Sequence, residues 1–345
     1  MPGGNGPFIA LDAVGGDHAP AAAIEGALEA VDELGLRVYL VGPSRLIRRE
    51  LGRFRSVPRG IELVDAPDVI EMDDSPLVVL RKKKQSSLNL CAQLVRDGQA
   101  AAMVTAGNTG AAWVAAKSTL GMIDGVERPA LAAILPKLEG NTLVLDVGAN
   151  VECRPRQLLQ FSVMGSLYAE HVLSVVRPRV GLMSVGEEEG KGGRKGREQY
   201  QALSRAGIRF IGNVEGSDVF SSDVDVIVCD GFTGNVILKV SEGLGEMIMA
   251  ALLDEARGSA MYGAGLLMAK GAFKNLKRRV DYTEYGGAPL LGVNGACLIC
   301  HGRSTGKAIR NALRFASLYA SSGVVEKIGA TVPAVLESNN NEGSS

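Results

Sequence analysis

Short apolar runs alternate along the chain with segments whose apolar residues recur at helical spacing. The first run, Phe8 to Leu11, contains no polar position and predicts a strand buried on both faces. The segment from Pro20 to Leu34 carries Ile24, Leu28 and Val31 at helical spacing and predicts a helix. This alternation predicts a three-layer α/β/α fold with a mostly parallel sheet. Further strands are expected at 37–41, 61–64, 101–105, 131–135, 142–145, 179–185, 208–211, 224–228 and 296–299.

Most of these strands end in a short polar cluster rich in glycine. Parallel strands place their carboxyl ends along one edge of a sheet, and ligands of open α/β sheets bind beyond those ends. Turn propensity explains any single cluster, whereas the repetition favours one shared pocket. The polar residues at these ends are Asp12, Asn108, Asn150, Glu187, Asn213, Asp230 and His301.

The first strand end, within FIALDAVGGDHAP, carries a dense set of polar groups. Gly15 and Gly16 permit a tight turn and the close approach of a ligand, and Asp17 and His18 follow directly. Two interpretations stay open: an ordinary strand-to-helix turn with a helix cap, or one wall of the pocket. In the second interpretation His18 handles a proton and Asp17 orients it.

Three later stretches add candidate anion-binding groups. The sequences GNTG and GFTG present Thr109 and Thr233 before apolar helices, although shared capping rules explain this repeat as well. Arg303 and Ser304 open a helix after the last strand and suit a phosphate; an ordinary serine cap is the alternative. The basic run Arg81 to Lys84 indicates either an acidic ligand or partner, or a solvated helix start.

Composition limits the function classes. The 345 residues include 37 basic and 38 acidic side chains, so no nucleic-acid partner is expected. Five cysteines in mostly apolar runs indicate reduced thiols of a cytoplasmic protein. We find no strand-linked GxGxxG motif and no zinc-ligand spacing, so neither a dinucleotide cofactor nor a metal is expected. No signal peptide or membrane-spanning run is apparent. We expect a flexible segment at 1–7, one α/β domain at 8–335 and a disordered tail at 336–345.

One segment, residues 241–280, departs from the strand–helix alternation. Apolar residues at helical spacing lead into a methionine- and leucine-rich stretch beside a basic cluster. This combination is typical of an interfacial membrane anchor. A helical dimer interface or the core of a small subdomain is the alternative, and a dimer would present two such tips to one membrane. The residues concerned are Met261, Leu266, Leu267, Met268, Lys274, Lys277, Arg278 and Arg279.

Taken together, the motifs resemble those of the bacterial phosphate acyltransferases of phospholipid synthesis. The similar stretches are IALDAVGGDHAP, LRKKKQSSL, VTAGNTGA, LDVGANVECRP, LMSVGEEEGKG, FIGNVEGSDVF, VCDGFTGNVILK and DYTEYGGAPLLGVNGACLICHGRS. The resemblance implies an isocitrate-dehydrogenase/phosphotransacetylase-like fold, a homodimer, and transfer of a long-chain acyl group from acyl-carrier protein to inorganic phosphate. It further implies peripheral attachment to the inner face of the cell membrane, where the acyl phosphate supplies a glycerol-3-phosphate acyltransferase.

Such a site must hold a phosphate dianion against a thioester and stabilise the oxyanion. Two other functions stay open: a metal- and NAD(P)-dependent decarboxylating dehydrogenase of the same fold group, and a non-catalytic membrane scaffold. The expected catalytic residues are His18, Asp17, Asn108, Asn235 and His301. The expected substrate- and phosphate-binding residues are Asp12, Gly15, Gly16, Arg81, Lys82, Lys83, Gly107, Thr109, Asn150, Asn213, Glu215, Asp230, Thr233, Arg303 and Ser304.

Overall fold

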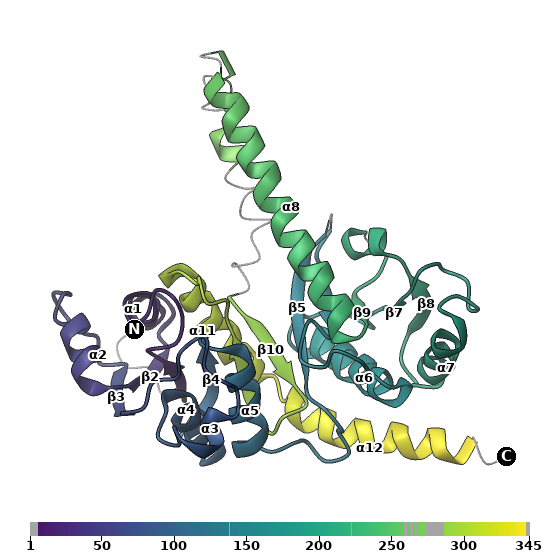
Figure 1. Cartoon of the computed structure of the whole chain (residues 1–345), viewed down its shortest axis with the longest axis horizontal. Helices are drawn as coiled ribbons and strands as arrows, with labels where there is room; N and C mark the ends of the chain where they lie inside the picture. The colour runs from purple at the N-terminus through teal and green to yellow at the C-terminus, as the bar shows by residue number, and fades with distance from the viewer. Residues whose placement is uncertain are drawn as a thin grey trace.

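The strands form one wide sheet (Figure 1). The computed structural model describes residues 6–137, 139–221, 223–258, 261–262, 265, 268–273 and 286–342. These residues contain 11 strands in the order β3-β2-β1-β4-β11-β10-β5-β6-β9-β7-β8. The strands are β1 (Phe8–Asp12), β2 (Arg37–Gly42), β3 (Ile61–Asp65), β4 (Ala100–Thr105), β5 (Ala130–Pro136), β6 (Asn141–Leu145), β7 (Val180–Met183), β8 (Phe210–Val214), β9 (Val226–Val228), β10 (Ala288–Leu291) and β11 (Ala296–Ile299).

The sheet consists of two parallel groups that run in opposite directions. Strands β3, β2, β1, β4 and β11 form the first group, and β6, β9, β7 and β8 form the second. Three antiparallel pairings, β11 with β10, β10 with β5 and β5 with β6, connect them. The sheet is therefore mostly parallel, as predicted. The expectation that every strand end lies along one edge is wrong, because three reversals turn the second group around.

Twist compensates for part of this reversal. Neighbouring strands of a sheet are typically rotated by roughly 20–25°. The five steps from β4 to β9 in the strand order therefore turn the strand direction by about a right angle or more. This rotation brings the carboxyl ends of the two groups toward each other instead of leaving them on opposite edges of a flat sheet.

The three layers follow from strands that are apolar on both faces. Ile9 and Leu11 of β1 belong to one buried cluster and Ala10 to the other. Strand β6 repeats this, with Leu143 and Leu145 in the first cluster and Val144 in the second. The helices that cover the first cluster are α1 (Ala21–Leu34), α2 (Ser44–Leu51), α6 (Pro155–His171), α7 (Gly193–Ser204), α11 (Gly306–Ser321) and α12 (Val324–Glu342). Those over the second are α3 (Val78–Arg81), α4 (Ser87–Arg96), α5 (Thr109–Thr119), the 3₁₀ helix η1 (Gly216–Phe220) and the base of α8 (Gly231–Gly258).

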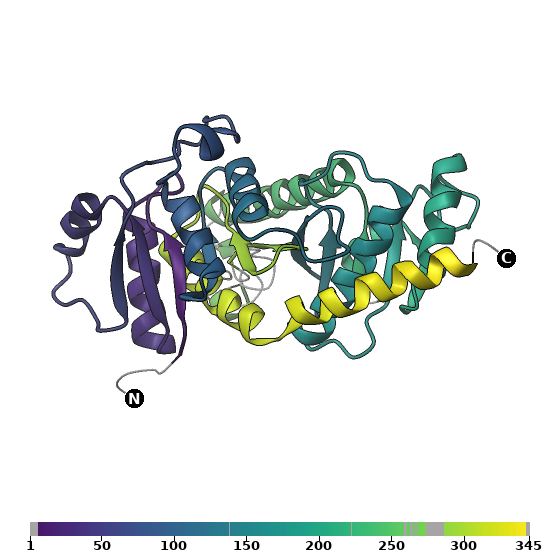
Figure 2. The same cartoon turned by 90° about the horizontal axis from the view of Figure 1, so that it is seen from below.

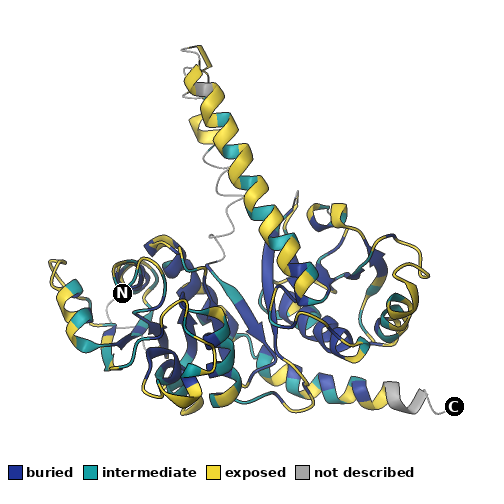
Figure 3. Ribbon diagram, viewed as in Figure 1, coloured by how far each residue is buried: buried dark blue, intermediate teal, exposed yellow. Residues whose placement is uncertain are grey.

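Helix α8 begins at the GFTG stretch and continues into the segment that starts at residue 241. It runs for 28 residues and projects from the body of the molecule (Figure 1). Ile237 and Leu238 pack its base against the second cluster, whereas most of the projecting length is exposed (Figure 3). Met261 and Met268, beyond its end, are 74% and 91% exposed. The other residues predicted for the membrane tip, Leu266, Leu267, Lys274, Lys277, Arg278 and Arg279, lie outside the described residues.

The C-terminal segment also differs from its prediction. Residues from 336 onward were expected to be disordered, yet α12 continues through Leu336 to Glu342. Leu336 is buried in the first cluster, and this contact explains why the helix extends into a polar sequence. Figure 2 shows α12 running along the second group of strands, with the two termini at opposite ends of the molecule. Among the described residues, no helix is both long and apolar enough to cross a membrane.

An ionic cluster secures the sheet at the amino-terminal ends of β7 and β9, away from the strand ends that carry the polar clusters. Asp225 accepts hydrogen bonds from Lys137 Nζ at 3.0 Å, and from the Arg179 backbone N–H and Nε at 2.9 and 3.0 Å. Burial by itself would raise the pKa of Asp225, but the hydrogen bonds from Arg179 and Lys137 outweigh it and lower the pKa to about 2. The ionised carboxylate therefore stabilises the folded chain.

We expect the Asp225→Asn variant to lower the free energy of unfolding by about 2 kcal/mol at neutral pH, measured by urea titration. Because the folded-state pKa lies below the unfolded value of 3.8, this contribution is present above about pH 4 and disappears as the pH falls toward 2. Asp223→Asn is the matched control, since Asp223 is 91% exposed and lies 3.8 Å from the same arginine. A difference between wild type and Asp225→Asn that stays constant from pH 6 to pH 2 would contradict this account.

Candidate active site

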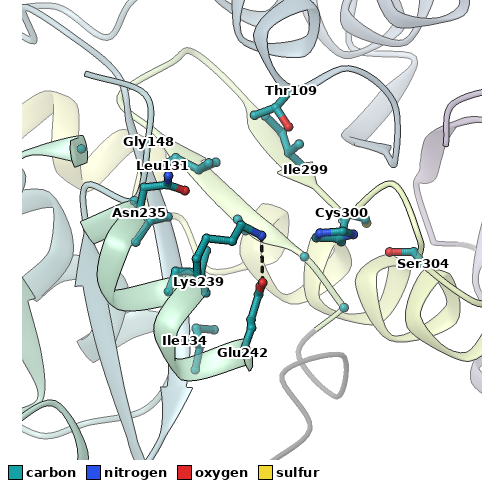
Figure 4. A pocket seen from close by; sticks show the side chains of 18 of the residues that line it. Thr109, Leu131, Ile134, Gly148, Asn235, Lys239, Glu242, Ile299, Cys300 and Ser304 are labelled. Atoms are coloured by element: carbon teal, nitrogen blue, oxygen red, sulfur yellow. Dashed lines mark hydrogen bonds and ion pairs between the residues drawn. The ribbon is translucent and has the colours of Figure 1, made fainter. Parts of the chain in front are cut away.

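The carboxyl ends of four strands meet at one pocket of about 430 Å³ (Figure 4). Residues that follow β4, β6, β9 and β11 line it, together with residues of β5 and β10. Because β4 and β11 belong to the first group and β6 and β9 to the second, the pocket lies between the two groups. Its apolar lining comprises Leu131, Ala133, Ile134, Val147, Val151, Phe232, Leu238, Ala288, Ile299, Cys300 and Ala308.

Three helices begin at this pocket. Helix α5 starts at Thr109, α8 at Gly231 and α11 at Gly306, and the lining includes Thr109, Gly231 and Ser304. The first N–H groups of a helix have no partner within the helix, and the helix dipole places partial positive charge there. At α8 the N–H groups of residues 231–234 are already hydrogen-bonded to Asn150, Val151 and Asp230, so this helix end acts on a ligand through its dipole alone. The positive ends of three helix dipoles beside one pocket favour an anionic ligand.

The residues that cap two of these helices were predicted to act on the substrate. Asn108 Oδ1 accepts an N–H from the first turn of α5 at 2.9 Å, and its Nδ2 donates to the carbonyl oxygens of Met72 and Asp74, both at 2.9 Å. Asp230 Oδ1 accepts the N–H of Thr233 at 3.0 Å. Both donor hydrogens of Asn108 are therefore engaged with the protein, and these contacts position the helix starts.

A buried carboxylate organises the strand ends of the first group. Asp12 accepts a hydrogen bond from Thr105 Oγ1 at 2.7 Å, and Thr105 Oγ1 accepts the N–H of Gly107 at 2.9 Å. Burial raises the pKa of Asp12 despite these hydrogen bonds. A Cβ atom on Gly15 would lie 2.7 Å from the Gly107 nitrogen, so this close approach requires glycine. Asp12, Gly15 and Gly107 thus support the loop that carries Thr109.

A second buried carboxylate, Asp146, organises the strand ends of the other group. It accepts N–H hydrogen bonds from Leu131, Gly148, Ala149 and Asn150, and one from Asn150 Nδ2, at 2.6–3.2 Å. Burial raises its pKa as well. The sequence analysis missed Asp146, although LDVGA after β6 repeats the strand–Asp–Gly pattern of LDAVGG after β1.

Close backbone packing joins this loop to α8. The Gly231 N–H donates to the Asn150 carbonyl oxygen at 2.7 Å, and a Cβ atom on Gly231 would lie 2.6 Å from that oxygen. Gly148, on the same loop, lies beside Asn235, whose Oδ1 is 3.9 Å from the position of a Cβ on that glycine. The loop therefore fixes the first turns of α8 and the place of Asn235 in the pocket lining.

His301 follows β11 and lines the pocket. Its Nδ1 accepts the backbone N–H of Arg303 at 3.2 Å, and its carbonyl oxygen accepts the N–H of Ser304 at 2.9 Å. With Nδ1 acting as an acceptor, the neutral imidazole carries its proton on Nε2. The residue is exposed, so Nε2–H is available to donate a hydrogen bond to a ligand.

An ion pair on α8 completes the polar lining. Lys239 Nζ lies 2.8 Å from Glu242 Oε2, and both residues line the pocket (Figure 4). Neither was among the expected site residues. Their spacing of three on an amphipathic helix is common on protein surfaces, so the sequence alone gave no reason to select them.

Four of the predicted site side chains line the pocket: Thr109, Asn235, His301 and Ser304. The turn after β1 lies next to this set, since the Asp17 N–H donates to the Gly302 carbonyl oxygen at 2.8 Å. Predicted residues that do not belong to the pocket lining include His18, Gly16, Arg303, Arg81, Lys82 and Lys83. Within this set Lys83 forms an ion pair with Asp74.

Two predicted binding residues lie further along the sheet: Asn213 on the edge strand β8 and Glu215 directly after it. Asn213 donates through Nδ2 to the Glu188 carbonyl oxygen at 2.8 Å. Glu215 and Asp218 cap η1 reciprocally. Neither Asn213 nor Glu215 is part of the pocket lining. Across the described part of the chain, no group of three or more His, Cys, Asp or Glu side chains is placed to hold a metal ion.

Comparison with solved structures identifies the fold. A phosphotransacetylase from Streptococcus pyogenes superimposes with a TM-score of 0.63 over 92% of this chain and 95% of its own, at 14% identity. A branched-chain phosphotransacylase from Enterococcus faecalis superimposes with a TM-score of 0.57 over 92% of this chain and 100% of its own, at 12% identity. These similarities support the predicted isocitrate-dehydrogenase/phosphotransacetylase-like architecture.

Comparison of sequences identifies the family. The family described as "Fatty acid synthesis protein" matches residues 8–327. The "Phosphate acyltransferase" of Pelotomaculum thermopropionicum is 49% identical over 327 residues, 95% of each chain. That of Heliobacterium modesticaldum is 49% identical over 330 residues, 95% of this chain and 98% of its own. The chain therefore belongs to the phosphate acyltransferase family of fatty acid synthesis proteins, and it is an acyltransferase.

Proposed function

We propose that the chain transfers a long-chain acyl group from the thioester of acyl-carrier protein to inorganic phosphate, releasing acyl phosphate. One observation carries the proposal: three helix amino termini lie beside a pocket whose remaining lining is mostly apolar. The helix starts suit the phosphate, and side chains such as Leu131, Ile134 and Phe232 suit the beginning of an acyl chain.

The chemistry requires little beyond positioning and charge stabilisation. A phosphate oxygen attacks the thioester carbonyl carbon, a C–O bond forms, and the C–S bond breaks with the electron pair leaving on sulfur. The transient oxyanion is stabilised by the positive ends of the helix dipoles and by Asn235. His301 Nε2–H is suited to donate a hydrogen bond to the departing thiolate and so to stabilise its charge. The reaction as written needs neither a redox cofactor nor a metal.

The projecting helix supports a further part of the proposal, namely a homodimer in peripheral contact with an anionic membrane. Its exposed apolar side chains are of the kind that pack against a second copy or enter a lipid interface. These side chains are Val240, Leu244, Met247, Ile248 and Leu253, followed by Met261, Tyr262 and Met268. At the inner face of the membrane the acyl phosphate would be handed to a glycerol-3-phosphate acyltransferase. The basic run 81–84 keeps its predicted role toward an acidic partner, which in this proposal is the carrier protein.

Purified protein incubated with palmitoyl-acyl-carrier protein should consume the thioester only when phosphate is added, with no metal or nucleotide present. The acyl phosphate should be captured as a hydroxamate by hydroxylamine, and EDTA should leave the rate unchanged. Thioester loss without phosphate would exclude the proposed acceptor. A requirement for NAD(P) and a divalent metal would favour the dehydrogenase alternative, and no reaction at all would favour the scaffold.

The two histidines near the strand ends are expected to differ. We expect His301→Ala to lower kcat roughly 100-fold, because it removes the hydrogen-bond donor that stabilises the leaving thiolate. The His18→Ala variant is the matched control and should stay within a few-fold of wild type, since His18 is outside the pocket lining. Steady-state kinetics of both variants provide the measurement. An equal loss in both would give His18 a part in the reaction as well, and a loss in His18→Ala alone would overturn the assignment of His301.

The double variant Met261→Glu with Met268→Glu should no longer sediment with vesicles that contain anionic lipid, while its activity on soluble substrate is retained. Charged side chains at these exposed positions oppose insertion into the lipid interface. Val176→Glu, at an equally exposed apolar residue of another surface, is the control and should sediment as wild type does. If the double variant sedimented as wild type does, the proposal that this tip contacts the membrane would be wrong.

A further inference from the structure

Lys239 is the sole lysine or arginine among the pocket-lining residues that the structure describes. It projects from the third turn of α8, and its side chain is 50% exposed. In Figure 4 its ammonium group points from α8 toward the side of the pocket that carries Cys300 and Ser304. A dianion bound at the helix starts would therefore have one full positive charge within the same lining.

Glu242 occupies the position next to this charge. Its carboxylate is 2.8 Å from Lys239 Nζ, and only 14% of its side chain is exposed. The pair is formed along one helix at a spacing of three residues, a kind of contact that stabilises helices weakly. Phosphate carries up to twice the charge of this carboxylate and offers several acceptor oxygens, so it competes effectively for the ammonium group.

We propose that Lys239 is the phosphate-binding cation of the pocket, and that Glu242 holds its ammonium group in place until phosphate displaces the carboxylate. This inference rests on the proposed phosphate-dependent reaction. When the lysine turns from Glu242 to phosphate, the attacking dianion is held between a cation and the helix starts. Glu242 acts as a positioning residue, because it touches Lys239 and competes with phosphate for it.

The basic residues predicted earlier are placed less favourably for this role. Arg81, Lys82 and Arg303 are exposed and do not line the pocket. Lys83 is paired with Asp74, whose backbone is in turn hydrogen-bonded to Asn108. Lys239, by contrast, lies on the same helix as Asn235 and one turn beyond it, and both residues line the pocket.

The two members of the pair should respond in opposite directions. Lys239→Ala is expected to raise the KM for phosphate about 10- to 100-fold, with the KM for acyl-carrier protein little changed. Glu242→Gln removes the competing carboxylate and should lower the KM for phosphate a few-fold. Lys239→Arg, which keeps the charge, should recover most of the phosphate affinity. If the pair had only a structural role, Lys239→Ala and Glu242→Gln would impair the enzyme alike.

Glu246→Gln is the matched control, since Glu246 lies one turn further along α8, is exposed and does not line the pocket. It should leave both KM values unchanged. Circular dichroism melting verifies that each variant is folded, and calorimetric titration of inorganic phosphate without acyl donor gives a readout independent of turnover. Phosphate affinity should fall in Lys239→Ala and rise in Glu242→Gln.

The wild-type reaction separates the two proposals. If wild-type enzyme shows no phosphate-dependent thioester loss, the proposed function fails. If it does, and Lys239→Ala binds and uses phosphate as wild type does, the assignment of Lys239 fails alone. A rise in the KM for acyl-carrier protein without a change for phosphate would likewise overturn it, because the lysine would then contact the acyl donor.

Discussion

Two buried carboxylates, one in each group of strands, hold the site together. A carboxylate removed from water must have its oxygen atoms hydrogen-bonded. Asp12 meets this requirement through Thr105, and Asp146 through five donors on its own loop and β5. Each therefore determines the path of a glycine-rich loop after a strand. Since helices α5 and α8 start from or pack on these loops, the direction of their amino termini follows from the two carboxylates.

Because strand direction reverses in the middle of the sheet, the site combines an apolar surface with polar groups from two different groups of strands. Strands β5 and β10 run between the two parallel groups, and apolar side chains from them form part of the lining. The polar groups of the lining come from strand ends and helix starts in the two parallel groups that flank β5 and β10. An arrangement of this kind suits a reaction that joins a hydrophobic acyl chain to a hydrophilic anion, because each substrate part meets a different surface of one pocket.

Helix α8 connects the site to the exposed tip through a single element. Its base carries Asn235, Lys239 and Glu242 in the pocket lining, and its projecting part carries exposed apolar side chains. The sequence analysis treated these as two features, a GFTG motif after a strand and a separate helical segment. They form one helix, since neither proline nor a chain reversal interrupts residues 231–258.

The sequence by itself determined the positions of the long buried strands and the polar groups that end them. Apolar runs such as Phe8–Leu11 have only one stable environment, a sheet covered on both faces. Only the tertiary structure decided which strand ends meet, because hydrophobic periodicity contains no information on pairing direction or twist. For that reason Asn213 and Glu215, at the edge strand, fall outside the pocket, whereas His301 and Asn235 enter it. The roles of Asp146 and Lys239 were likewise hidden, since each depends on contacts that the fold creates.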